Sequence, residues 1–145
     1  MTEFHSAKDD GAVVRTAACS CGSLKVTVEG PPADVYACSC LECQRASGSA
    51  FTYAAVFRDS AVRSIEGEYR SWRRISEPGR WVESSFCPVC GSPVMGRVEA
   101  MPGILLVSVG SFADPAFAIP AKLYWSSMRH HWLSLPPEVE AVAEQ

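Results

Sequence analysis

Seven cysteines are the residues whose types and spacing point most directly to chemistry in this sequence. They form three clusters: Cys19-Ser20-Cys21-Gly22, Cys38-Ser39-Cys40-Leu41-Glu42-Cys43 and Cys87-Pro88-Val89-Cys90-Gly91. Sulfur atoms one or two residues apart on tight loops are typical of ligands that share one metal ion. Structural cysteines that pack as small apolar side chains are common singly, but not in three clusters. We therefore predict that the cysteines bind zinc.

The cysteine count also argues against a disulfide scaffold. Seven is an odd number, and seven cysteines in 145 residues are sparse compared with a disulfide-rich domain. Residues 1–10 lack the basic and apolar regions of a signal peptide, and no apolar run approaches the roughly 18 residues of a membrane span. We expect reduced thiols in a cytoplasmic protein that has no membrane partner.

Seven sulfur ligands can be divided between a closed and an open zinc site. A structural zinc has four protein ligands, whereas a catalytic zinc has three and keeps a position for water or substrate. In a zinc knuckle, glycine usually follows the second cysteine, because the backbone turns sharply there. This pattern predicts a structural zinc on Cys19, Cys21, Cys87 and Cys90, and a second zinc on Cys38, Cys40 and Cys43. The alternative is a zinc ribbon made by Cys40, Cys43, Cys87 and Cys90, which would leave the first pair unused.

A fourth protein ligand could close the second site. The candidates are His5, His130, His131 and Glu42. Adjacent histidines point to opposite faces of an extended chain, so at most one of His130 and His131 could reach the metal. We interpret the histidines as surface or interface residues and expect the three-cysteine site to stay open.

The elements that carry the clusters are predicted to be short antiparallel strands. Leu24, Val26 and Val28 alternate with polar residues, which indicates a half-buried strand that ends at the Gly30-Pro31-Pro32 breaker. Residues 51–57 are typical of a strand buried on both faces. The Pro-Gly pairs in 77–80 and 100–103 predict two hairpin turns, of which the second joins 94–99 to 104–109. Helical periodicity is confined to 41–46 and the tail 138–144.

Length and charge limit the remaining function classes. A chain of 145 residues, 48% of them hydrophobic, is expected to form one main domain. We place a flexible N-terminus at 1–17, a zinc-binding domain at 18–133 and a C-terminal tail at 134–145. The net charge of −3 argues against general nucleic-acid binding, because phosphate neutralisation needs a basic surface.

The order of the cysteine clusters resembles a known family. Gln44-Arg45-Ala46-Ser47-Gly48 follows the second cluster, and Phe86, Ser92 and Pro93 flank the third. With the seven cysteines, these residues resemble the glutathione-dependent formaldehyde-activating enzyme family, also called the centromere protein V family, over about residues 18–132. The segments 109–115 and 124–132 resemble the family more weakly. The resemblance implies a mainly β fold called the β-tent, with a structural zinc on Cys19, Cys21, Cys87 and Cys90 and a catalytic zinc on Cys38, Cys40 and Cys43.

The family name implies carbon–sulfur lyase-type chemistry on glutathione and formaldehyde, or on a related small thiol and aldehyde. Arg45 is our candidate for a substrate-binding cation, since a thiolate ligand added to the three cysteines increases the negative charge. Ser39 stands where many family members have His, so a proton relay through that His is absent. We interpret Arg70, Arg73, Arg74 and Arg80 as residues of a solvated edge strand rather than as carboxylate ligands.

Two other function classes fit the same cysteine pattern. A non-enzymatic zinc module that binds a protein partner would have a filled fourth position or an occluded triplet. A thiol redox or aldehyde sensor would use the triplet sulfurs themselves as the reactive groups. A homo-oligomer is compatible with each of these classes.

Overall fold

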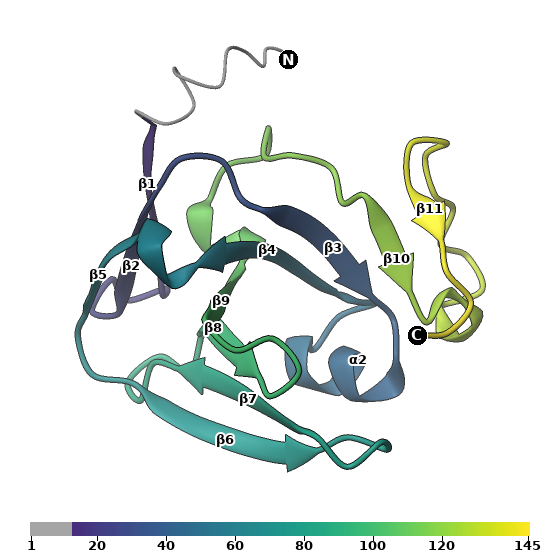
Figure 1. Ribbon diagram of the computed structural model, residues 1–145, viewed down its shortest axis with the longest axis horizontal. Helices are drawn as coiled ribbons and strands as arrows, with labels where there is room; N and C mark the ends of the chain where they lie inside the picture. The colour runs from purple at the N-terminus through teal and green to yellow at the C-terminus, as the bar shows by residue number, and fades with distance from the viewer. Residues whose placement is uncertain (1–12) are drawn as a thin grey trace.

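Two β-sheets form the frame of residues 13–145, the part of the chain that the computed structural model describes (Figure 1). The smaller sheet has the order β1-β2-β5 and consists of β1 (Val14–Ala18), β2 (Lys25–Glu29) and β5 (Val62–Glu66). The larger sheet has the order β11-β10-β3-β4-β9-β8-β7-β6. Its strands are β3 (Asp34–Cys38), β4 (Thr52–Arg58), β6 (Arg70–Ile75), β7 (Trp81–Phe86), β8 (Pro93–Val98), β9 (Ile104–Ser108), β10 (Lys122–Tyr124) and β11 (Glu140–Ala141). The expectation of a mainly β protein with short strands is confirmed.

The main core contains apolar side chains from both sheets. Leu24, Val26 and Val28 are fully buried, which confirms the alternation that predicted β2. In β4, Ala55 and Phe57 join this core, whereas Ala54 and Val56 belong to a second cluster that includes Leu106 of β9. Successive side chains of a strand point to opposite faces. The strand is therefore buried on both faces over residues 54–57, as its sequence predicts.

Both predicted hairpin turns are present. The turn after β6 is closed by a hydrogen bond from the Ser76 backbone N–H to the Arg80 carbonyl, at 2.8 Å, and leads into β7. The turn at 100–103 connects β8 to β9. All strand pairings are antiparallel in the described residues except those of β10, which runs parallel to β3 and to β11.

One α-helix, α2 (Leu41–Ser47), is present in the described part of the chain, and it confirms the helical pattern at 41–46. Short 3-10 turns cover Asp59–Ala61, Val109–Phe112 and Ser126–Met128. None of the helical segments between residues 13 and 145 is long and apolar enough to cross a membrane.

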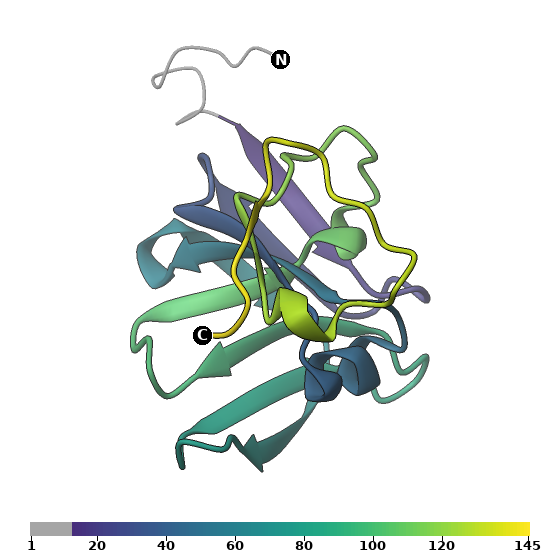
Figure 2. The same cartoon turned by 90° about the vertical axis from the view of Figure 1, so that its right-hand side faces the viewer.

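The predicted helix at 138–144 is wrong. Glu140 and Ala141 form β11 instead, and the Val142 backbone N–H donates to the Leu123 carbonyl at 3.0 Å. Val139 is buried with Ala37 and Leu123, so a single apolar anchor fixes this segment rather than a helical stripe. Figure 2 shows the C-terminal segment, in yellow, running along the outside of the molecule. Because Val139 is buried, the segment that the sequence predicts to be a C-terminal tail packs against the rest of the structure.

The N-terminal boundary also differs from the sequence interpretation. Strand β1 begins at Val14, four residues before the expected domain start at residue 18, and Ala17 is fully buried in the main core. The rest of the predicted flexible segment, residues 1–12, lies outside the described residues.

Candidate metal centres and the adjoining cavity

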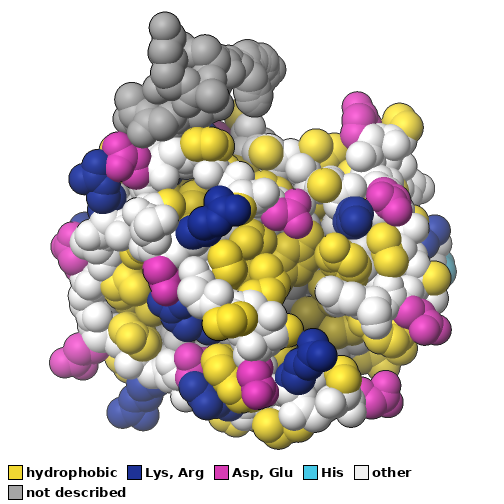
Figure 3. Space-filling view, in the orientation of Figure 1, with side chains coloured by type: hydrophobic (Ala, Val, Ile, Leu, Met, Phe, Trp, Pro, Cys, Tyr) yellow, Lys and Arg dark blue, Asp and Glu magenta, His cyan; other side chains and the backbone are white. Residues whose placement is uncertain are grey.

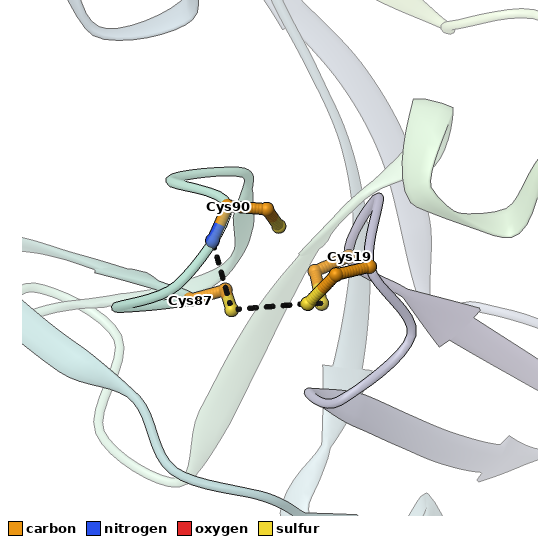
Figure 4. A group of neighbouring side chains, drawn as sticks. Cys19, Cys87 and Cys90 are labelled. Carbon is orange, nitrogen blue, oxygen red and sulfur yellow. Dashed lines mark hydrogen bonds between the residues drawn. The ribbon is translucent and has the colours of Figure 1, made fainter.

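Two turns from different sheets bring four cysteines together. Cys19 and Cys21 lie between β1 and β2, whereas Cys87 and Cys90 lie between β7 and β8 (Figure 4). Their Sγ atoms are all within 4.8 Å of one another, with 3.6 Å between Cys19 and Cys21 and 3.7 Å between Cys21 and Cys87. Zinc–sulfur bonds of about 2.3 Å in a tetrahedron place sulfur atoms about 3.8 Å apart. The four thiols fit a tetrahedral zinc ion.

Backbone groups support these sulfurs as they do in zinc knuckles. The Leu24 N–H donates to Cys19 Sγ at 3.2 Å, and the Val89 N–H donates to Cys87 Sγ at 3.3 Å. Gly22 and Gly91 have φ values of 82° and 80°, a left-handed conformation that glycine adopts without strain. The glycine pattern therefore correctly predicted which cysteine pairs lie together in the structure.

Serine hydroxyls form a second layer around the four sulfurs, and no pattern in the sequence predicts them. Ser23 Oγ lies 3.2 Å from Cys21 Sγ and 3.4 Å from Cys87 Sγ. Ser92 Oγ lies 2.9 Å from Ser20 Oγ, which joins the two turns directly. The hydrogen bond with Ser92 lowers the pKa of Cys90 to about 5. The hydroxyl groups thus favour the thiolate form, which is the form that binds metal.

The remaining three cysteines gather where β3 ends and α2 begins. Cys38 is the last residue of β3, Cys40 is the N-cap of α2, and the Cys43 backbone N–H donates to Cys40 Sγ at 3.3 Å. The three Sγ atoms lie within 4.8 Å of one another. Hydrogen bonds with Cys38 and Cys43 lower the pKa of Cys40 to about 2, whereas hydrogen bonds with Cys40 and Cys43 raise the pKa of Cys38. Three sulfur atoms this close together could hold one metal ion, and the low pKa of Cys40 favours the thiolate form that binds it.

The grouping of the sulfurs decides between the two alternatives. The structure forms one group of four and one group of three, so the ribbon of Cys40, Cys43, Cys87 and Cys90 is not formed. No fourth His, Asp or Glu joins the triplet within residues 13–145. Glu42 instead pairs with Arg45 at 3.0 Å, and His5 lies outside the described residues.

The triplet loop is held by a hydrogen-bond network centred on Gln44. Its Nε2 donates to the Ser39 carbonyl at 2.8 Å and to the Met128 carbonyl at 3.0 Å. His130 Nε2 lies 3.0 Å from Gln44 Oε1. The amide oxygen accepts a hydrogen bond from the imidazole N–H, because the amide nitrogen already faces two carbonyls. Ser39 is fully buried and its Oγ bonds to the Ala50 carbonyl at 3.4 Å. No role for Gln44 is predicted from the sequence, since two of its partners, Met128 and His130, lie in a distant segment.

A cavity of about 130 Å³ adjoins the triplet on the sheet face opposite the main core. It lies between α2 and the β6–β7 hairpin, and Figure 3 shows a hollow lined by hydrophobic side chains on this side of the molecule. Apolar walls come from Ala54, Val82, Val98 and Leu106, and polar groups come from Tyr36, Cys43, Ser47, Thr52, Arg74, Glu83, Ser84 and Ser108. The triplet therefore has a space beside it for a small molecule.

Arg74 and Tyr36 give this cavity its electrostatic character. The Arg74 charge adds to the Cys38 and Cys43 hydrogen bonds that lower the pKa of Cys40. Burial raises the pKa of the Tyr36 phenol, so this hydroxyl keeps its proton. From its sequence, Arg74 is predicted only to be a solvated edge residue, because alternation alone does not tell which face of an edge strand is covered.

Arg45, the predicted substrate-binding residue, lies elsewhere. It lines a separate, open hollow of about 470 Å³ together with Leu41, Gln44, His130 and Trp132. Its side chain is 73% exposed and paired with Glu42. Arg74 rather than Arg45 is thus the arginine that shares a cavity with a cysteine of the triplet, Cys43.

The chain matches known proteins both in sequence and in fold. The model of a family described as "Glutathione-dependent formaldehyde-activating enzyme" matches residues 14–128. Among solved structures, the chain is similar to the crystal structure of a Rhodobacter sphaeroides protein, a structural genomics target, with 23% identity and a TM-score of 0.55. That match covers 72% of this chain and 97% of the other chain, and it supports the fold alone.

Proposed function

This chain belongs to the glutathione-dependent formaldehyde-activating enzyme family, and on that premise we propose that it makes and breaks the carbon–sulfur bond between a small thiol and a small aldehyde. The thiol and aldehyde named by the family are glutathione and formaldehyde. The observation that carries the proposal is the cluster of Cys38, Cys40 and Cys43, which has three protein ligands and adjoins a cavity. An open metal site next to a cavity is what a catalytic centre needs.

The two cysteine clusters would then divide structural and catalytic work. Cys19, Cys21, Cys87 and Cys90 would hold a zinc ion whose four ligand positions are filled by protein. Cys38, Cys40 and Cys43 would hold a second zinc ion with one position free. Zinc bound there would supply a Lewis acid that binds the substrate thiol and lowers its pKa.

The residues around the triplet would orient the reactants and manage one proton. In the condensation, the thiol S–H bond breaks, a carbon–sulfur bond forms, and the carbonyl oxygen becomes a hydroxyl group. Tyr36 and Ser108 line the cavity and can donate hydrogen bonds to that oxygen. The buried Ser39 hydroxyl is engaged with the Ala50 carbonyl, so it does not replace the missing His relay.

Cobalt substitution tests the proposed function directly. Sulfur-to-cobalt charge-transfer bands change when another thiolate enters the metal shell. We expect glutathione to change the spectrum of the cobalt-loaded wild-type protein and not that of Cys40→Ala. We also expect the zinc form to accelerate exchange between formaldehyde and its glutathione adduct.

S-methylglutathione is the matched control ligand, because its thioether has no proton to lose. It should leave the cobalt spectrum unchanged. If no thiol alters the spectrum and no adduct exchange exceeds that of the zinc-free protein, the enzyme proposal fails. A non-enzymatic zinc module that binds a protein partner would then be the better account.

A further inference from the structure

Arg74 occupies a position that the proposed chemistry does not use. Within the described residues it is the only side-chain cation that lines the cavity beside the triplet. It is also the only half-buried residue of β6, since the other five residues of this strand are exposed. This strand therefore differs from an edge strand that is solvated throughout, because its one half-buried residue is an arginine that lines a cavity.

The strand register explains why Arg74 and its neighbour Arg73 differ. Arg74 lies opposite Val82 and lines the cavity, whereas Arg73 lies opposite Glu83 and does not line it. Arg73 Nε is 3.0 Å from Glu83 Oε2, and its Cζ is 3.9 Å from the centre of the Trp81 ring. Arg73 is therefore compensated by an anion and an aromatic ring, while Arg74 forms no ion pair with any residue in 13–145.

A cation without an ion-pair partner in a cavity with apolar walls favours the binding of an anion. The walls formed by Ala54, Val98 and Leu106 supply no hydrogen-bond acceptors from their side chains. Glu83 reaches the cavity lining but its carboxylate is engaged with Arg73. Guanidinium groups bind carboxylates through two parallel hydrogen bonds, which gives both affinity and orientation.

We propose that Arg74 is a specificity-determining residue that selects thiols carrying a carboxylate. It binds this carboxylate while the substrate sulfur binds at the metal site of the cysteine triplet. The inference rests on the proposed function and names its substrate class. The cavity of about 130 Å³ is smaller than the roughly 300–1,000 Å³ of a site that encloses a drug-sized ligand. A short mercapto acid would fit inside it, and a peptide thiol would enter only with its thiol-bearing end and one acid group.

Paired thiols of equal length test the role of the carboxylate. The cobalt-loaded protein is titrated with 3-mercaptopropionate and with 3-mercaptopropionamide, and affinities are taken from the charge-transfer bands. We expect wild type to bind the acid about tenfold or more tightly than the amide. Arg74→Gln should abolish this preference while its affinity for the amide stays within about threefold of wild type. Arg74→Lys should retain part of the preference.

Arg70→Gln is the matched control, because it removes the same charge from an exposed position of the same strand that does not line the cavity and leaves the Arg73–Glu83 ion pair in place. It should keep the wild-type preference. A second pair, glutathione and its glycine ethyl ester, distinguishes a peptide thiol from a short mercapto acid as the source of the carboxylate. Equal weakening of acid and amide in Arg74→Gln would mean that Arg74 only balances the charge of the triplet, and would overturn the inference.

The outcomes also separate this inference from the proposed function. If both thiols change the wild-type spectrum with equal affinity, the carboxylate selection is wrong and the proposed function stands. If neither thiol changes the spectrum, both fail together. Calorimetric titration of the zinc-loaded protein with the same thiols provides a measurement that depends on neither cobalt nor catalysis.

Discussion

Gln44 connects the cysteine triplet to a distant part of the chain through a single side chain. Its amide donates to the carbonyl of Ser39, which lies between two of the triplet cysteines, and to the carbonyl of Met128. Groups that orient metal ligands typically contribute a factor of about 10–100 to metal affinity. We expect Gln44→Leu to release the triplet zinc about 10–100-fold more readily while the four-cysteine zinc is retained. Competition with a chromogenic chelator, followed by elemental analysis, measures this difference.

Arg45→Ala is the control for Gln44→Leu because it alters the adjacent residue of the same helix. The ion pair of Arg45 with Glu42 is exposed, and such pairs contribute about 0–1 kcal/mol to stability. This variant should keep wild-type zinc affinity at both sites. If Gln44→Leu also behaves like wild type, the hydrogen bonds to Ser39 and Met128 do not hold the triplet loop.

Among the elements, the loop between β5 and β6 approaches the first cysteine turn so closely that it requires glycine. Gly67 has φ of 94°, and a Cβ atom at this position would lie 1.9 Å from the Ser23 carbonyl oxygen. Gly67→Ala must therefore displace the turn that holds Cys21. We expect the variant to lose at least about 2 kcal/mol more stability than backbone strain alone explains. Thermal unfolding followed by circular dichroism measures the loss.

Gly79→Ala measures the loss of stability caused by backbone strain alone. Gly79 has φ of 90° in the β6–β7 turn, but a Cβ atom there meets nothing within 4 Å. This variant should cost about 1–2 kcal/mol, which lowers the melting temperature by only a few degrees in a domain of this size. Equal decreases in melting temperature for the two variants would contradict the steric contact between Gly67 and Ser23.

The elements that the sequence predicted well are those whose signal is local. Alternation in 24–28 predicted β2, the Pro-Gly pairs predicted two hairpins, and glycine after Cys21 and Cys90 predicted which sulfurs come together. The features that the sequence did not predict depend on contacts between distant segments. Nothing within β6 indicates that Arg74 rather than Arg73 is covered, because the covering residues come from α2 and from other strands. Likewise, β11 forms because Val139 meets Ala37 and Leu123.

At the scale of the whole molecule, the four-cysteine cluster joins the two sheets. Cys21 and Cys87 are 66 residues apart, and closing a loop of that length costs about 4 kcal/mol beyond a constant. A structural zinc contributes about 10–16 kcal/mol in peptides, which is comparable to the 5–15 kcal/mol stability of a domain. The triplet, in contrast, lies within one short loop whose ends are already fixed by β3 and by β4. The two clusters should therefore contribute very differently to stability.

Serine substitutions in the two clusters test this difference. We expect Cys87→Ser to unfold or aggregate, because it opens the connection between the turns that join β1 to β2 and β7 to β8. Cys43→Ser should stay folded, with a melting temperature only a few degrees below wild type, and should lose one of two zinc ions. Melting temperatures combined with zinc content per chain measure both effects, with the wild-type protein purified under reducing conditions without chelators. If the two variants are equally destabilised, the triplet is structural as well, and a wild-type content of one zinc or less would overturn the two-site model.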